Sequence, residues 1–160
     1  MTVVVDSSAL ISLARIGRLD LLPRIAGAVH IPEAVYREVV EHGTGRPGSA
    51  EVAGAAWILR RSVRDPTSVE PLRARLGRGE AEAIVLAKEL GADFLVVDDA
   101  VARRAAGSEG LVVVGLIGLL ISAKQRGLIP EIKPLLDELL ASGFFLDESR
   151  YRSILRGAGE

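Results

Sequence analysis

Acidic side chains follow two apolar runs of this 160-residue sequence, directly after each run ends. Asp6 follows Val3–Val5, and the pair Asp98 and Asp99 follows Phe94–Val97. Runs of this composition are typical of buried strands in a parallel sheet, and open α/β sheets place their ligand crevices at the carboxyl ends of such strands. The sequence therefore predicts that these acids meet at one edge of a sheet.

Two predicted helices each supply one more acid. Glu80 extends the inward apolar stripe of the helix Gly79–Leu90, and Glu38 lies beside the apolar face of the helix Pro32–Glu41. A carboxylate that extends a buried stripe needs a partner, because an unpaired buried charge is very costly. Glu82 points away from the stripe of Glu80 and is the weaker candidate.

Carboxylates that meet at one edge of a sheet repel each other unless a cation joins them. The sequence has no cysteine and no histidine pair at metal-binding spacing, so this set favours a hard ion with oxygen ligands, Mg²⁺ or Mn²⁺. The chemistry that suits such an ion is hydrolysis of a phosphodiester, in which metal-activated water attacks and the metal stabilises the departing oxygen.

Each of these acids also has a structural alternative. Asp6 can cap the helix that follows it, and so can one member of the pair Asp98 and Asp99. Glu80 can interact favourably with a helix N-terminus, and Glu38 can be a solvated residue on its helix. The sequence alone leaves these alternatives open.

The arginines are the candidate contacts to a phosphate-bearing substrate. The net charge is −1, which excludes binding of nucleic acid by bulk positive charge. Local arginines or a bound metal must therefore make the contact. Arg103 and Arg104 follow the second acidic strand end closely, and we expect them to hold a phosphate near the metal.

The predicted strands and helices alternate along the chain. The predicted strands are Val3–Val5, Val29–Ile31, Trp57–Val63, Phe94–Val97 and Leu111–Val114. The predicted helices cover residues 9–14, 18–27, 32–41, 49–56, 79–90, 101–106, 115–126, 132–141 and 149–156, with a loop over 64–71. Alternation of this kind predicts an α/β fold in which a central parallel sheet is sandwiched between helices. The length and the absence of a linker predict one domain.

The composition narrows the class of protein further. Hydrophobic residues make up 49% of the chain but aromatic residues only 4%, so the core is aliphatic. The absence of cysteine suits a cytoplasmic protein, and we expect no signal peptide. The most apolar stretch, Leu111–Ala123, is too short to span a bilayer, so no membrane association is expected. Its helical part is apolar almost all round, and we expect it to be buried.

Four segments, in this order along the chain, resemble the PIN-domain proteins, specifically their uncharacterised prokaryotic, toxin-like branch. They are Val3–Ile11, Ile31–Val39, Gly79–Ala87 and Leu95–Asp99, and segments of the C-terminal third such as Val114–Leu120, Ala123–Ile129 and Gly143–Phe145 are also similar. The resemblance covers nearly the whole chain. It implies a PIN-like three-layer α/β/α sandwich over 1–160, with 146–160 as a C-terminal helical extension.

The resemblance also implies a metal-dependent ribonuclease. Asp6 matches the first acid of the family, Glu38 the second, and either Asp98 or Asp99 the fourth. Glu80 lies where PIN domains more often have Asp, and its longer side chain could shift or weaken the metal site. Ser7 matches a small hydroxyl position beside the first acid, so it joins the catalytic candidates and would orient a water or a ligand.

The partners implied by the resemblance are RNA as substrate, a small antitoxin protein that inhibits the enzyme, and a second copy in a homodimer. Many relatives are toxins of toxin–antitoxin pairs, which predicts a toxin-like endoribonuclease.

Two other functions compete with this prediction. An aspartyl phosphotransferase would also place Asp after an apolar strand, but the second Asp expected two residues later is Ser8 in this sequence. The other alternative is a catalytically weak PIN-like module that binds nucleic acid or protein, with acids placed too loosely to hold a metal tightly.

Overall fold

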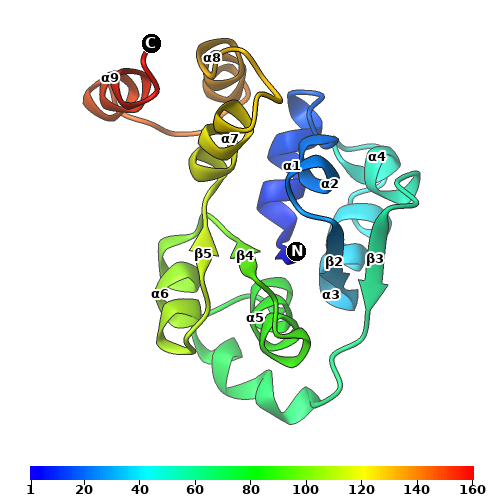
Figure 1. The fold of residues 1–160 in the computed structure, drawn as a ribbon. Helices are drawn as coiled ribbons and strands as arrows, with labels where there is room; N and C mark the ends of the chain where they lie inside the picture. Colours follow the sequence, from blue (N-terminus) through cyan, green and yellow to red (C-terminus); the bar gives the residue numbers. More distant parts are fainter.

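The computed structural model describes residues 1–160 and contains a five-stranded sheet in the order β3-β2-β1-β4-β5 (Figure 1). All four pairings are parallel. The strands are β1 (Thr2–Val5), β2 (Ala28–Pro32), β3 (Ile58–Arg61), β4 (Phe94–Val96) and β5 (Val113–Val114). The predicted α/β class and the central parallel sheet are confirmed. The strand ending in Asp6 is the central one, so its carboxyl end lies in the middle of the sheet edge.

Helices cover both faces of the sheet and form two separate cores (Figure 1). Val3 and Val5 pack on the face covered mainly by α1 (Ser7–Arg15), α2 (Leu21–Ile25), α7 (Leu116–Gln125) and α8 (Lys133–Ala141). Val4 packs on the opposite face, against α5 (Arg78–Leu90) and α6 (Ala100–Ser108). This division follows from the alternation of side chains along a strand. The three-layer sandwich is confirmed.

The helix expected over 32–41 changes its geometry halfway. It begins as α3 (Glu33–Tyr36) and continues as a π-helix, η1 (Arg37–Glu41). A π-turn changes the direction in which the following side chains point, and such turns are frequent at functional sites. Glu38 lies in this widened part of the helix.

Between η1 and α5 the chain contains β3 and three short helical elements. These elements are α4 (Ser49–Ala53) and two 3₁₀ turns, η2 (Pro66–Ser68) and η3 (Glu70–Ala74). The predicted loop over 64–71 therefore includes helical turns, because the Asp65 side chain accepts a hydrogen bond from the backbone N–H of Thr67 and starts η2.

The C-terminal part of the chain packs against α7 and α8. The apolar helix α7 is buried through Leu116, Leu119, Leu120 and Ala123, as expected. The last helix, α9 (Glu148–Gly157), lies on the outside of this group (Figure 1). None of the helices combines the length and the apolar character needed to cross a bilayer.

Candidate active site

Asp6 lies where β1 ends and α1 begins, and only 2% of it is exposed. Its Oδ1 accepts a hydrogen bond of 3.0 Å from the backbone N–H of Ala9, so Asp6 does cap α1. Burial, the largest cause, and the charges of Asp98, Glu80 and Glu38 nevertheless raise the pKa of this carboxyl to about 7, although the hydrogen bond from Ala9 acts in the opposite direction. Asp6 is therefore both a helix cap and a member of a cluster of acids.

Glu38 is brought to the same edge by the π-helix η1. Its Oε2 accepts a 2.7 Å hydrogen bond from the Ser7 hydroxyl, and its Oε1 accepts a 3.1 Å hydrogen bond from the backbone N–H of Gly79. This carboxylate therefore connects the starts of α1 and α5. A Cβ at position 79 would lie 2.5 Å from Glu38 Oε1, so only glycine allows this approach.

Glu80 is half-buried in the first turn of α5 and faces Asp99. Burial and the neighbouring charges of Asp99 and Glu38 raise the pKa of Glu80. Asp99 itself caps α6, because its Oδ2 accepts a 2.9 Å hydrogen bond from the backbone N–H of Ala102.

Asp98 points to a different side from Asp99. Its Oδ1 accepts a 3.0 Å hydrogen bond from the backbone N–H of Leu116, at the start of α7. Burial raises the pKa of Asp98, although this hydrogen bond and the nearby Arg103 act in the opposite direction. The structure thus places Asp98 near Asp6 and Asp99 near Glu80, a distinction that two adjacent identical residues could not reveal in the sequence.

Glu82 is buried but takes no part in this cluster. Its Oε1 accepts a 3.1 Å hydrogen bond from the backbone N–H of Ala34, at the start of α3, and Arg78 lies 3.7 Å from its Oε2. A carboxylate at this place satisfies one of the free N–H groups of a helix start. Glu82 therefore fixes α5 against α3.

The donor set of the cluster fits a hard divalent cation. All of its charged groups are carboxylates. A cation would offset the burial and the mutual repulsion that together raise the pKa values of Asp6 and Glu80. In this structure no three acidic or histidine side chains converge closely enough to hold one ion between them. The carboxylates instead accept hydrogen bonds from backbone N–H groups and from Ser7, so binding an ion would require some of them to rotate.

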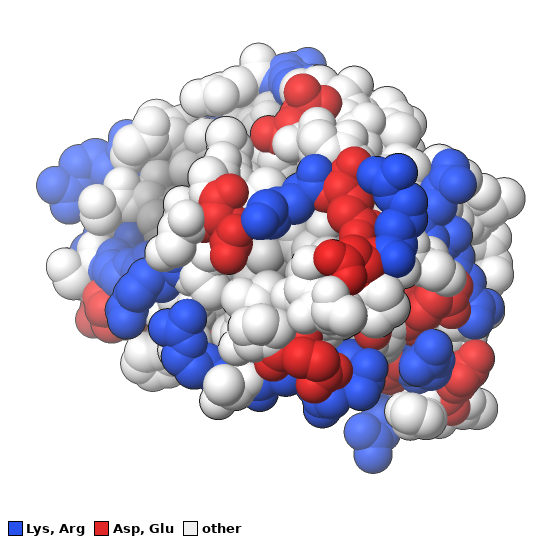
Figure 2. Space-filling model, turned by 90° about the horizontal axis from the view of Figure 1, so that it is seen from below, with Lys and Arg blue, Asp and Glu red and all other residues white.

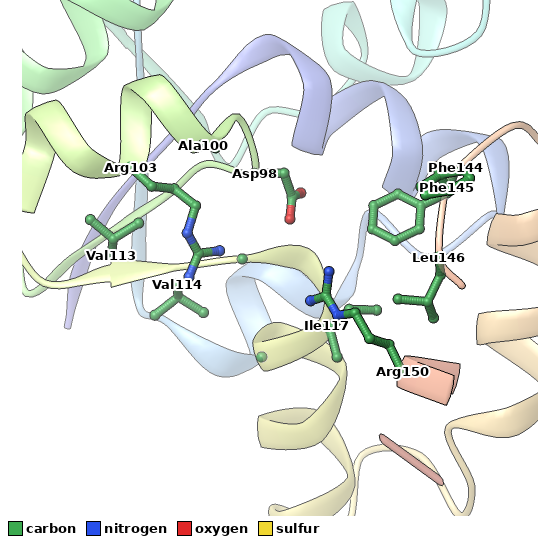
Figure 3. A pocket seen from close by; sticks show the side chains of 12 residues that line it. Asp98, Ala100, Arg103, Val113, Val114, Ile117, Phe144, Phe145, Leu146 and Arg150 are labelled. Atoms are coloured by element: carbon green, nitrogen blue, oxygen red, sulfur yellow. The ribbon is translucent and has the colours of Figure 1, made fainter. Parts of the chain in front are cut away.

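A cleft of about 890 Å³ opens beside Asp98 (Figure 3). Arg103 of α6 and Arg150 of α9 both line it. Arg104 is exposed on α6 and is not among the lining residues. A smaller hollow of about 380 Å³ is lined by Glu38 and by two further arginines, Arg15 and Arg46. Asp98 and Glu38 thus each share a hollow with cationic side chains.

The face seen in Figure 2 shows no concentration of positive charge. The face that carries α5, α6 and the 3₁₀ turns shows acidic and basic side chains interspersed (Figure 2). This mixture agrees with the net charge of −1.

Several site features could not be found by sequence reasoning. Gly79 precedes a predicted ligand. Only its position in the first turn of a helix, where glycine is unfavourable, indicates that this residue has a special role. Gly115 allows Asp98 and Arg103 to approach the start of α7, because a Cβ there would collide with both side chains. Arg150 lies far from the acids in the sequence and joins them only through the packing of α9.

Comparison with known proteins agrees with this architecture. The family model DUF3368, described as a PIN domain, matches residues 2–160. A search of curated proteins finds no match. The solved structure of a PilT N-terminus domain protein from the hyperthermophilic archaeon Sulfolobus solfataricus P2 is similar, with a TM-score of 0.58 and 19% identity over 77% of this chain and 93% of that chain. At this identity the likeness shows a shared fold. Since the family model spans nearly the whole sequence, the chain belongs to the PIN-domain family, whose members are generally nucleases.

Proposed function

We propose that this protein is a metal-dependent endoribonuclease that hydrolyses RNA phosphodiester bonds. The observation that supports this proposal is the gathering of carboxylates from four segments of the chain at the carboxyl edge of the sheet. This gathering affects Asp6 most, because burial and three neighbouring acids raise the pKa of its carboxyl to about 7. A protein tolerates such a cluster at a cost in stability, which is typical of a functional site.

Four acids would hold the ion: Asp6, Glu38, Glu80, and either Asp98 or Asp99. When bound, Mg²⁺ or Mn²⁺ would supply activated water and stabilise the oxygen that leaves phosphorus. Ser7 fixes the Glu38 carboxylate through its hydroxyl, and Gly79 does so through its backbone N–H.

The arginines beside the cluster would bind the substrate backbone. Arg103 lies next to Asp98 and is within the cleft, so its guanidinium can donate hydrogen bonds to a phosphate close to the acids. Arg104 would act only on a longer strand that extends over α6, since it lies outside the cleft.

The choice of RNA rests on the resemblance to toxin-like PIN proteins. The same resemblance supports two further parts of the proposal, a small inhibitory antitoxin protein and a homodimer. Light scattering during size-exclusion chromatography would test the homodimer, and a monomeric mass would remove it from the proposal.

A catalytically weak binding module is the second candidate. It is favoured by one observation: no three acids converge on a single point in this structure. Metal affinity separates the two candidates, because an ion that binds only the folded protein raises its stability by mass action. The nuclease should show a rise in Tm with millimolar Mn²⁺, whereas the module should show none.

The decisive experiment is cleavage of one single-stranded and one structured RNA in the presence of Mn²⁺. Wild type, Asp6→Asn and wild type with EDTA are compared. We expect cleavage by the wild type only. Full activity of Asp6→Asn, or activity that EDTA leaves unchanged, would refute the proposed mechanism, and a folded wild type that cleaves neither RNA would favour the binding module.

A further inference from the structure

The cleft beside Asp98 contains an aromatic side chain that no fold requirement explains. Phe145 lines this cleft and is 86% exposed, while every other aromatic residue of the chain is at least partly buried. Exposing a phenylalanine to water to this extent is unfavourable. Its neighbour Phe144 packs partly against the core and so holds the backbone of this segment in place.

Two guanidinium groups share the cleft with this ring. Arg103 reaches in from α6 and Arg150 from α9, and the two phenylalanines lie on the side away from Arg103 (Figure 3). Arg150 forms no ion pair within the chain, although its neighbour Arg152 on the same helix pairs with Glu148 at 2.7 Å. The cleft therefore offers an unpaired positive charge and an aromatic face beside the cluster of acids.

We propose that this cleft binds the unpaired nucleotides of single-stranded RNA next to the scissile phosphate, with a base stacked on Phe145 and a backbone phosphate held by Arg150. The inference rests on the proposed nuclease function and names the side chains of this chain that would hold its substrate. Base stacking on an exposed aromatic ring combined with a cationic groove is the usual way in which proteins hold single strands. A paired base cannot reach the ring, because it remains stacked within its duplex.

Charge and continuity favour a nucleic acid over a protein as the occupant. Asp98 belongs both to the acidic cluster and to the wall of the cleft, so a strand bound there continues directly to the reacting phosphate. The volume of about 890 Å³ lies within the usual range for ligand sites, about 300–1,000 Å³.

Binding of labelled RNA to the full chain in EDTA, measured by fluorescence anisotropy, tests the inference without cleavage. The probes are one single-stranded oligonucleotide, its duplex, and versions with an abasic site at successive positions. The variants are Phe145→Ala, Phe145→Tyr and Arg150→Ala. The controls are Arg152→Ala on the same helix and Leu59→Ala on β3, which remove one positive charge and one exposed apolar side chain outside the cleft.

Phe145→Ala should weaken binding of the single strand by about 5- to 150-fold, and Phe145→Tyr should retain it. One abasic position should weaken binding to the wild type but not to Phe145→Ala. Arg150→Ala should lower the slope of log affinity against log salt by about 0.7, the value for one lost phosphate contact on a single strand. Both controls should bind as the wild type does.

Three results would overturn the inference. One is that the wild type and Phe145→Ala bind the single strand with equal affinity. Another is that the wild type binds the duplex as tightly as the single strand. The third is a Phe145→Ala variant that changes oligomeric mass but not RNA binding, which would assign the ring to a contact between copies. If the wild type still cleaves RNA with Mn²⁺ in any of these cases, the proposed nuclease function stands and only the subsite fails.

Discussion

Two properties of Asp6 destabilise its charged form in the folded protein: the side chain is buried, and its neighbours are acids. The helix cap provided by its Oδ1 offsets part of this cost. An asparagine at this position would keep an oxygen for the cap and remove the charge, since Asn and Asp are equally good caps.

We therefore expect Asp6→Asn to stabilise the metal-free protein while abolishing the proposed activity. The pKa of Asp6 is raised from 3.8 to about 7 in the folded state, so its destabilising effect is absent below pH 3.8, grows as pH rises, and is complete above about 7. At about pH 8 the gain in the free energy of unfolding would be at most about 4 kcal/mol, or several degrees in Tm. Thermal unfolding in EDTA at about pH 5 and about pH 8 measures it.

The gain should be smaller at the lower pH, and added Mn²⁺ should stabilise the wild type but not the variant. Asp147→Asn is the matched control, because Asp147 caps α9 in the same way at an exposed position. A metal-free Asp6→Asn protein less stable than the wild type at about pH 8 would show that this carboxylate does not carry a buried, repelled charge.

Elements act on the site through the places where their backbones approach one another. The start of α5 and the π-helix η1 meet at Gly79, whose N–H binds the Glu38 carboxylate. The π-turn sets the direction of Glu38, and the missing side chain at position 79 leaves room for it.

Gly79→Ala should lower the rate of RNA cleavage and the metal affinity much more than the stability of the fold. The added methyl group would lie 2.5 Å from Glu38 Oε1 and force this carboxylate away from Gly79 and Ser7. Displacements of about 1 Å at a catalytic centre cost on the order of 100-fold in rate. The rate of RNA cleavage and the Mn²⁺ affinity of the variant measure this effect.

Gly107→Ala is the control for the glycine substitution itself. Gly107 lies in α6, and a Cβ there would meet nothing within 4 Å. Alanine should stabilise that helix by about 0.5–1 kcal/mol and leave activity unchanged. Wild-type metal affinity in Gly79→Ala would mean that Glu38 does not contribute to the ion site.

At the scale of the whole molecule, one carboxylate makes several of the contacts that attach the C-terminal segment to the body. Glu160 accepts hydrogen bonds from the backbone N–H groups of Ile132 and Lys133, and from Lys124 at 2.8 Å. Although desolvation acts against it, these contacts lower the pKa of Glu160 to about 2. This charge thus contributes to the attachment of the helix that carries Arg150, beside the packing of Ile154 and Ala158 against the core.

Glu160→Gln should therefore lower Tm at neutral pH and have less effect in acid. Because the folded-state pKa is below the ordinary value of 4.5, the stabilisation is complete above that value and is lost as pH falls towards about 2. Thermal unfolding of both proteins between these two pH limits should show that the difference in Tm becomes smaller as the pH falls. Glu148→Gln, which breaks only an exposed ion pair with Arg152, should change Tm little at any pH, and an equally small effect of Glu160→Gln would contradict the prediction.

The sequence by itself determined the features that local patterns encode. Apolar runs followed by acids identified β1 and β4, because a buried parallel strand needs apolar residues on both faces. The helix α5 and its end at Gly91, where φ is 60°, followed from helical spacing and a glycine stop. Chain order then implied that Asp6 and the pair Asp98 and Asp99 share one sheet edge.

Only the tertiary structure decided how those elements place their side chains against each other. Glu38 binds Gly79, which is 41 residues away in the sequence. The π-helix that directs Glu38 to this place has no signal in the sequence pattern. Asp98 and Asp99 are identical in type but face α7 and α6, respectively. Phe145 and Arg150 join the site through the packing of the C-terminal segment. Periodicity fixes which face of a helix is apolar, but the angle and position at which helices pack depend on contacts between distant residues, and those contacts set the geometry of this site.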